Sequence, residues 1–129
     1  WCRRDTCTFW DRQGARWGTV SPSVGPLLLL VRDERARDDA DAKFFAGLLT
    51  VLDGLSPMGM QVRLVMIPDA EPGGVRLTTL KGYELRMDLF GDVADQLRTL
   101  EVYLSDRVRT GVAPQEYIDL RTPGRVYYK

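Results

Sequence analysis

The chemically most reactive side chains in this sequence are those of two cysteines, Cys2 and Cys7, because the sequence contains no histidine. Ser-His-Asp and Cys-His catalytic groups are therefore excluded, and a zinc site would be short of ligands. Four residues separate the cysteines. A tight hairpin of that length brings two Cα atoms within disulfide range, so we predict a disulfide in an oxidising compartment, with two free buried thiols as the alternative. Redox-active pairs usually have two intervening residues at a helix start, which this pair lacks.

Carboxylates could in principle perform acid–base chemistry at two places, between Asp38 and Asp41 and at Asp88 with Asp92. Both groups fall near expected helix starts, where carboxylates cap a helix or remain solvated, so we assign them that role. Gly73-Gly74 lacks the later glycine, lysine and helix of a phosphate-binding loop, and we expect a turn there. The sequence thus predicts no catalytic residue, no metal site and no cofactor, and an uncharacterised hydrolase is the least favoured class.

The elements that would position these residues follow from hydrophobic periodicity. Residues 6–18 predict a β-hairpin around Asp11–Gly14, and Leu27–Val31 predicts a short strand buried on both faces. A helix is predicted from about Ala36 to Leu55, because apolar residues recur there at steps of three and four. Its core face is expected to consist of Phe44, Leu48, Leu52 and Leu55.

The second half repeats the alternation of strands and helix. Residues 61–67 predict a strand, and residues 74–89 predict a hairpin around Lys81-Gly82. Asp92 is expected to cap a second helix that ends near Gly111, and two strands follow at 116–121 and 125–129. The core side of the second helix is expected to consist of Val93, Leu97, Leu100 and Leu104. The predicted fold is a single α+β domain over residues 1–129, with a mostly antiparallel sheet and both amphipathic helices packed on one face.

The balance of charged residues limits the classes of binding partner that the sequence supports. Eighteen basic and eighteen acidic residues give a formal net charge of zero, so nothing indicates nucleic-acid or anionic-membrane binding. The longest apolar run, Leu27–Val31, is far below the roughly 20 residues of a membrane-spanning helix. The chain starts at Trp1 rather than Met, and we therefore expect a fragment or processed product whose membrane anchor would lie upstream.

The order of these elements resembles the extracytoplasmic β-domain of FtsQ/DivIB cell-division proteins over nearly the whole chain. The most specific likeness is Tyr117-Ile118-Asp119-Leu120-Arg121, which is similar to the family's Asp-Leu-Arg segment after a leucine-rich helix. Phe9-Trp10-Asp11 with Gly14, and the Leu80–Tyr83 turn, resemble two further family hairpins. The resemblance implies an upstream transmembrane helix and POTRA domain, both absent from this chain, with Trp1 and Cys2 as the tail of a strand leaving that domain.

The resemblance also implies a function. Family members are non-catalytic divisome scaffolds that bind the membrane-anchored coiled-coil proteins FtsB/DivIC and FtsL during septation, outside the cytoplasm and at the division septum. Partners add a strand to the sheet edge around and after the Asp-Leu-Arg segment. The matching positions here are Arg121, Gly124, Arg125, Val126, Tyr127 and Tyr128. Thr122 stands where the family often has an aromatic residue, which puts the geometry of the partner in question.

A different class of function also fits the composition, namely a small secreted or periplasmic ligand-binding domain. Such a protein would have a concave site lined with aromatic residues such as Trp10, Trp17 and Tyr83 around convergent polar groups. A scaffold would instead have a shallow, open sheet edge. The shape of the surface around these three residues therefore discriminates between the two functions.

Overall fold

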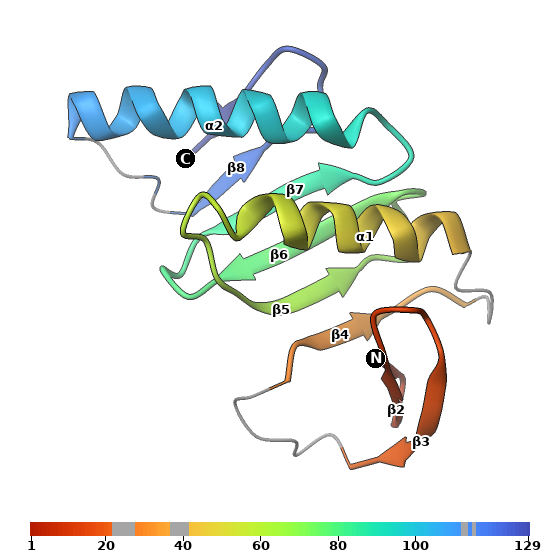
Figure 1. The fold of residues 1–129 in the computed structure, drawn as a ribbon. Coiled ribbons are helices and arrows are strands. Elements are labelled where there is room, and N and C mark those ends of the chain that lie inside the picture. Colours follow the sequence, from red (N-terminus) through yellow and green to blue (C-terminus); the bar gives the residue numbers. More distant parts are fainter. Residues whose placement is uncertain (22–27, 37–41, 112–113, 115) are drawn as a thin grey trace.

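A computed structural model describes residues 1–21, 28–36, 42–111, 114 and 116–129 of the chain. These residues form a nine-stranded sheet with two helices in front of it (Figure 1). The helices are α1 (Ala42–Leu55) and α2 (Val93–Thr110). The strands are β1 (Cys2–Arg3), β2 (Thr6–Trp10), β3 (Arg16–Val20), β4 (Leu30–Asp33), β5 (Val62–Ile67), β6 (Gly74–Thr79), β7 (Glu84–Asp88), β8 (Tyr117–Asp119) and β9 (Tyr127–Tyr128).

The sheet is mixed, and the predicted mostly antiparallel sheet is wrong. Its strand order is β3-β2-β1-β4-β5-β6-β7-β8-β9. The pairs β1 with β4, β4 with β5, and β7 with β8 are parallel. The other five neighbouring pairs are antiparallel. The arrangement is an α+β-like fold that contains two parallel crossovers.

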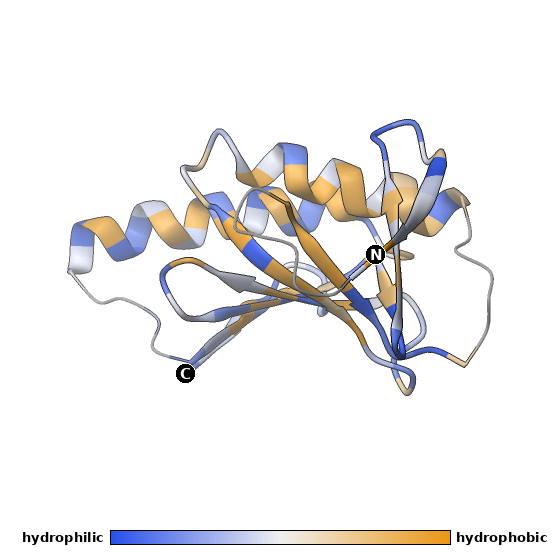
Figure 2. Ribbon diagram, turned by 90° about the horizontal axis from the view of Figure 1, so that it is seen from below, coloured by the Kyte–Doolittle hydropathy of each residue, from blue (hydrophilic) through white to orange (hydrophobic). Residues whose placement is uncertain are grey.

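The helices explain two of the three parallel pairs, β4 with β5 and β7 with β8, and the placement of both helices on one face. α1 connects β4 to its neighbour β5, and α2 connects β7 to its neighbour β8. The 14 residues of α1 span about 21 Å, which returns the chain to the end where β4 began, so β5 runs parallel to β4. β4 and β7 run in the same direction, and each crossover moves the chain one strand closer to the β9 edge of the sheet. Right-handed connections then place both helices on one face, as Figures 1 and 2 show.

The core lies between the helices and this face of the sheet. In α1 the buried residues Phe44, Leu48, Val51 and Leu55 recur at steps of four, three and four. Leu52, Val93, Leu97 and Leu104 were also predicted for the core, and they are half-buried against it, while Leu100 is fully buried. Alternate strand residues complete the core, and apolar positions run along the central strands in Figure 2. These strand residues are Val65, Ile67, Val75, Leu77, Leu85, Met87 and Ile118.

Several local predictions are confirmed. β2 and β3 form the first hairpin, in which Asp11 N–H donates to the Ala15 carbonyl at 3.1 Å, and β6 and β7 form the second. Asp92 caps α2 by accepting a hydrogen bond from the Asp95 N–H at 2.9 Å. Gly111, with φ of 71°, ends the helix and donates its N–H to the Arg107 carbonyl.

Two boundaries differ from the predictions. α1 is described from Ala42, and most of its predicted first turn, residues 37–41, lies outside the described residues. The predicted strand Leu27–Val31 begins outside them as well, and β4 occupies Leu30–Asp33 instead. Burial on both faces is wrong for the described part of the predicted strand, because Val31 is buried whereas Leu28 is exposed and Leu30 is only half-buried. The apolar run therefore overlaps only the start of a strand with one covered face.

β1 was not predicted as part of this sheet, yet it lies between β2 and β4. Cys2 is opposite Cys7 in the β1–β2 register, and a disulfide joins them. Asp33 at the end of β4 is only 1% exposed and accepts hydrogen bonds from Arg3 at 2.7 Å, Arg35 at 2.9 Å and the Trp1 indole at 3.1 Å. Burial disfavours the charged form of Asp33, but bonds from Arg35 and Arg3 outweigh it and lower the pKa.

Candidate functional site: the C-terminal sheet edge

The predicted partner-binding residues lie at one end of the sheet, on β9 and the turn before it. Among the described strands β9 pairs only with β8, and Tyr128 is opposite Ile118. Lys129 and Tyr117 exchange both backbone hydrogen bonds, at 3.1 and 3.3 Å. Because an antiparallel ladder alternates, the N–H and C=O of the preceding residue, Tyr128, point away from β8. The outer side of β9 is therefore an unpaired edge within the described part of the chain.

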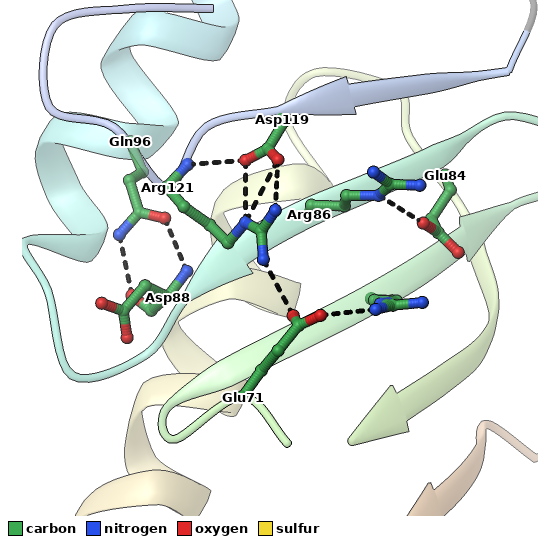
Figure 3. Close-up of polar contacts among 8 residues, drawn as sticks. Glu71, Glu84, Arg86, Asp88, Gln96, Asp119 and Arg121 are labelled. Atoms are coloured by element: carbon green, nitrogen blue, oxygen red, sulfur yellow. Dashed lines mark hydrogen bonds and ion pairs between the residues drawn. The ribbon is translucent and has the colours of Figure 1, made fainter. Parts of the chain in front are cut away.

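Arg121 leaves the end of β8 and folds back onto it (Figure 3). Its guanidinium binds Asp119 through Nε at 2.9 Å and Nη2 at 2.5 Å, and the Arg121 backbone N–H also donates to Asp119. Asp119 and Arg121, two residues apart on one face, thus form an ion pair. Leu120, between them, is buried in the core. The Asp-Leu-Arg segment is consequently a fixed corner, with two charged residues held on the sheet surface and one apolar residue beneath.

The charged corner extends to a second turn. Glu71 accepts from Arg121 Nη1 at 2.9 Å and from Arg76 Nη2 at 2.5 Å, so one carboxylate bridges two arginines (Figure 3). The Gly73-Gly74 pair allows this arrangement. Gly73 has φ of +75°, and a Cβ at Gly74 would lie 2.7 Å from the Glu71 Cβ. The predicted turn at this diglycine is confirmed, and its structural role is to seat Glu71.

The electrostatics of the corner favour the ionised forms of Asp119 and Arg121. Burial raises the pKa of Asp119, but the hydrogen bonds and positive charge of Arg121 outweigh burial, and the resulting pKa is lowered. Asp119 in turn raises the pKa of Arg121 through the same hydrogen bond. On the same face, Arg86 binds Glu84 at 2.7 Å and stacks over the Tyr117 ring at 4.1 Å. The corner is thus a network of compensated charges.

Gln96 anchors α2 beside this corner (Figure 3). It is 5% exposed, accepts from the Asp88 N–H and donates to the Asp88 carbonyl, both at 2.8 Å. The side chain of Asp88 accepts from the Phe90 N–H, and Asp92 caps the helix. The Asp88 and Asp92 carboxylates are therefore engaged in turn and cap roles, as expected from the sequence. The Asp38–Asp41 group lies outside the described residues.

Two tyrosines dominate the outer edge. Tyr127 is 50% exposed and Tyr128 is 49% exposed, and they alternate between the two faces of β9. Tyr128 faces α2, with its ring centroid 5.3 Å from that of Tyr103 and 4.0 Å from Arg107 Cζ. Tyr127 pairs with Asp119 and belongs to the opposite face. The edge therefore offers one aromatic ring on each side of the sheet.

The remaining nominated residues form the turn into β9. Arg125 donates its N–H to the Thr122 carbonyl at 3.1 Å, and Gly124 has the left-handed φ of 65° that closes such a turn. Val126 is half-buried against the core. The structure brings Gly124 to Tyr128 together at the edge, whereas Arg121 is turned toward Asp119 and Glu71.

The three aromatic residues of the ligand-binding alternative are not gathered in one site. Trp10 lines a cavity of about 510 Å³ between β1, β2 and α1, with Trp1 and Phe45 beside it. Trp17 is 63% exposed and donates to Asp11, while Tyr83 is buried in the core. Within the described ranges, no helix is long and apolar enough to cross a membrane, and no cluster of three metal-ligating residues occurs.

Sequence reasoning missed Glu71, Tyr103 and Arg107 at this end of the molecule. Glu71 sits in a Pro- and Gly-rich loop, and its arginine partners are distant in sequence. Arg107 and Tyr103 do carry a local signal, since they are four residues apart and share a helix face. That signal identifies a pair on α2 but not its contact with Tyr128.

Comparison with known proteins adds no relative, because no protein-family model and no curated protein matches this sequence.

Proposed function

We propose that this chain is a non-catalytic scaffold module that captures an extended segment of a partner protein as an additional strand on β9. The observation that carries the proposal is the unpaired outer side of β9, where the Tyr128 N–H and C=O point away from β8. Backbone hydrogen bonds to this side would set the register of the partner. The half-exposed rings of Tyr127 and Tyr128 would anchor it on the two faces.

The resemblance to FtsQ/DivIB proteins supports a particular partner class. In this proposal the captured segment belongs to an FtsB/DivIC-type protein, alone or with an FtsL-type protein, in a septation complex. The module would then act outside the cytoplasm, attached to the cell membrane at the septum through a segment outside this chain. The Asp119-Leu120-Arg121 motif and its position before the edge strand are the residues on which the likeness rests.

The charged corner supports strand capture by making the edge rigid. Arg121 joins β8 to Glu71 in the turn before β6, so the strand next to β9 is tied to the sheet interior. A fixed edge loses less conformational entropy on pairing than a mobile one. In this proposal Arg121 orients the edge, whereas the residues from Gly124 to Tyr128 meet the partner.

A proline at Val126 tests the proposal. By the alternation that applies to Tyr128, the Val126 N–H lies on the outer side of β9, and proline removes that donor. The binding partner is the extracytoplasmic segment of the FtsB/DivIC-like protein from the same genome, measured by calorimetry. We expect Val126→Pro to abolish binding, whereas Val126→Ala, which keeps the N–H, retains most of the affinity.

A second control addresses the other end of the sheet. Trp17 on the edge strand β3 is exposed, so Trp17→Ala is expected to leave partner binding unchanged. Persistence of binding in both Val126→Pro and a variant lacking residues 125–129 would show that the partner binds elsewhere. Thermal unfolding of each variant separates loss of the edge from loss of the fold.

The cavity beside Trp10 favours a second candidate, binding of an apolar small molecule. Its volume of about 510 Å³ lies in the range of ligand pockets, and Trp1 and Trp10 stack at 5.0 Å on its wall. Anilinonaphthalene sulfonate is a suitable probe, because its fluorescence rises in apolar sites. Saturable binding to the folded protein that is lost in Trp10→Ala would support this function, and no saturable binding would exclude it for such ligands.

A further inference from the structure

Arg107 is an uncompensated cation beside the β9 edge. Its Cζ lies 4.0 Å from the centroid of the Tyr128 ring and 4.9 Å from that of Tyr103, so the guanidinium stacks on both rings. No carboxylate of the described residues lies within ion-pair distance of Arg107, although Arg109, two residues later, is paired with Asp106 at 2.7 Å. The cluster of Tyr103, Arg107 and Tyr128 therefore has a positive charge with no carboxylate partner among the described residues.

Two buried donors in this cluster also have no hydrogen-bond partner in the part of the chain that the structure describes. They are the Tyr103 hydroxyl and the Arg107 Nε, and the Tyr103 side chain is 9% exposed. Unsatisfied buried polar groups are uncommon in native proteins, and each requires a structural or functional reason. The terminal nitrogens of Arg107 are not among the buried orphan atoms. The Arg107 side chain is partly exposed, so a group added beside β9 would approach its guanidinium from the solvent side.

The geometry of the edge determines which residue of a captured strand would meet Arg107. Tyr128 points its N–H and C=O outward, so a residue of an added strand would pair directly with it. Side chains of directly paired residues lie on the same face of a sheet, with Cβ atoms about 5 Å apart. Tyr128 is on the α2 face and in contact with Arg107. The side chain opposite Tyr128 would consequently project toward the guanidinium.

We propose that the captured segment carries an aspartate or glutamate at the position opposite Tyr128, and that this carboxylate pairs with Arg107. The inference rests on the proposed strand capture and specifies the partner further. A carboxylate matches the planar guanidinium and forms charge-assisted hydrogen bonds with it. The Tyr103 and Tyr128 rings would shield the pair from water on one side, which strengthens the interaction. Arg107 would thereby select the register of the incoming strand.

Selection from a phage library of random 12-residue peptides tests this inference and does not require the natural partner. Peptides are selected on the wild-type domain and screened against Val126→Pro to retain those that use the β9 edge. We expect the retained peptides to alternate apolar and polar residues and to share one acidic position. Selection on Arg107→Glu is expected to replace that acid by lysine or arginine.

Affinities of one retained peptide then measure the contact by fluorescence polarisation. Arg107→Gln should weaken binding at least tenfold, and Arg107→Lys should weaken it less because the charge remains. Arg109→Gln is the matched control, because it removes the same charge at an exposed position two residues after Arg107, and it should leave the affinity unchanged. Replacement of the shared acid by glutamine in the peptide provides the same test on an unaltered domain, should Arg107 variants fold poorly.

The outcomes separate the two proposals. Peptides that depend on Val126 but show no shared acid, or bind Arg107→Gln and wild type equally, would overturn the Arg107 contact and leave strand capture intact. Failure to recover any peptide sensitive to Val126→Pro would count against strand capture and the Arg107 contact together. Equal losses with Arg107→Gln and Arg109→Gln would indicate general electrostatic attraction and would also reject the specific pairing.

Discussion

Glu71 and Arg121, fifty residues apart in sequence, meet at 2.9 Å and tie the turn before β6 to the segment after β8. The contact joins two regions that share no strand pairing, since β6 pairs with β5 and β7 and β8 pairs with β7 and β9. Both side chains are partly exposed, so the pair alone contributes little. Its importance lies in the link to Asp119 and Arg76, which converts separate pairs into one network.

The network predicts a modest stability effect that is specific to Arg121. Arg121→Ala removes the contacts to both Asp119 and Glu71, and we expect it to lower the free energy of unfolding by about 1 kcal/mol. Urea denaturation with a far-ultraviolet circular dichroism signal measures this change. Arg125→Ala, on the exposed turn nearby, is the matched control and should unfold at the wild-type midpoint. Equal midpoints for both variants would show that the network adds no stability.

Asp33 predicts a dependence of stability on pH. Its lowered pKa means that the unfolded chain takes up this proton at a higher pH than the folded protein. Stability is therefore present above the ordinary aspartate pKa of about 3.9 and is lost as the pH falls through the lower value of the folded state. Asp119 acts in the same direction.

Asp33→Asn tests the contribution of the buried carboxylate. The amide cannot compensate Arg3 and Arg35, so we expect a loss of stability at pH 7. We also expect a flatter decline of stability as the pH falls through and below the ordinary aspartate pKa of about 3.9. Thermal unfolding at closely spaced pH values provides the measurement. If the stability of this variant declined with falling pH as steeply as that of the wild type, the acid sensitivity would be due to other carboxylates.

The contact between the two helices predicts a coupling between Gly54 and Leu97. A Cβ at Gly54 would lie 2.5 Å from Leu97 Cδ1, so Gly54→Ala overpacks the interface and should destabilise the protein by about 1 to 3 kcal/mol. Leu97→Ala alone should also destabilise it. In the double variant, the smaller side chain at 97 makes room for the new methyl group, and the combined loss should be less than the sum. Additive losses in chemical denaturation would show that positions 54 and 97 are not energetically coupled.

The disulfide predicts a covalent mass and a stability difference. Protein from an oxidising compartment should be lighter than the reduced form by the two hydrogen atoms of the Cys2 and Cys7 thiols, and it should resist alkylation when folded. A loop this short predicts a gain of about 2 kcal/mol over the reduced protein. Intact-mass spectrometry with and without reductant, followed by thermal unfolding of both forms, makes the comparison. Two alkylatable thiols in the non-reduced sample would contradict the prediction.

Local chemistry explains which parts of the fold could be predicted from the sequence. Asp92 and Gly111 bound α2 because cap residues act within one helical turn, and the alternation around Lys81-Gly82 identified the β6–β7 hairpin. The direction of β5 and β8 could not be predicted, because it depends on where each helix returns the chain. Leu52 and Leu97 were placed correctly against the core, although periodicity does not measure how deeply a residue is buried.

The candidate site was predictable only in its backbone frame. Residues 116–121 and 125–129 were expected as the last two strands, and β8 and β9 lie within them. The partners of Arg121 and Tyr128 were not predictable, since Glu71 and Tyr103 come from a distant loop and a helix. Contacts between segments so far apart depend on the complete topology, which short sequence patterns do not encode.

The position of β1 between the amino-terminal hairpin and β4 has a mechanical consequence. Among the described strands, the β2–β3 hairpin joins the rest of the sheet only through β1, whose two residues pair in parallel with β4 on their other side. Tension applied at Trp1 and resisted at the other end of the molecule would load these few hydrogen bonds and the bonds that Arg3 and Trp1 make to Asp33. It would also load the contacts of the hairpin with α1, the Arg12–Asp53 ion pair and the packing of Trp10 on Phe45. Under force the amino-terminal hairpin should detach first as a unit, with the disulfide keeping β1 and β2 together, while the sheet from β4 onward stays folded.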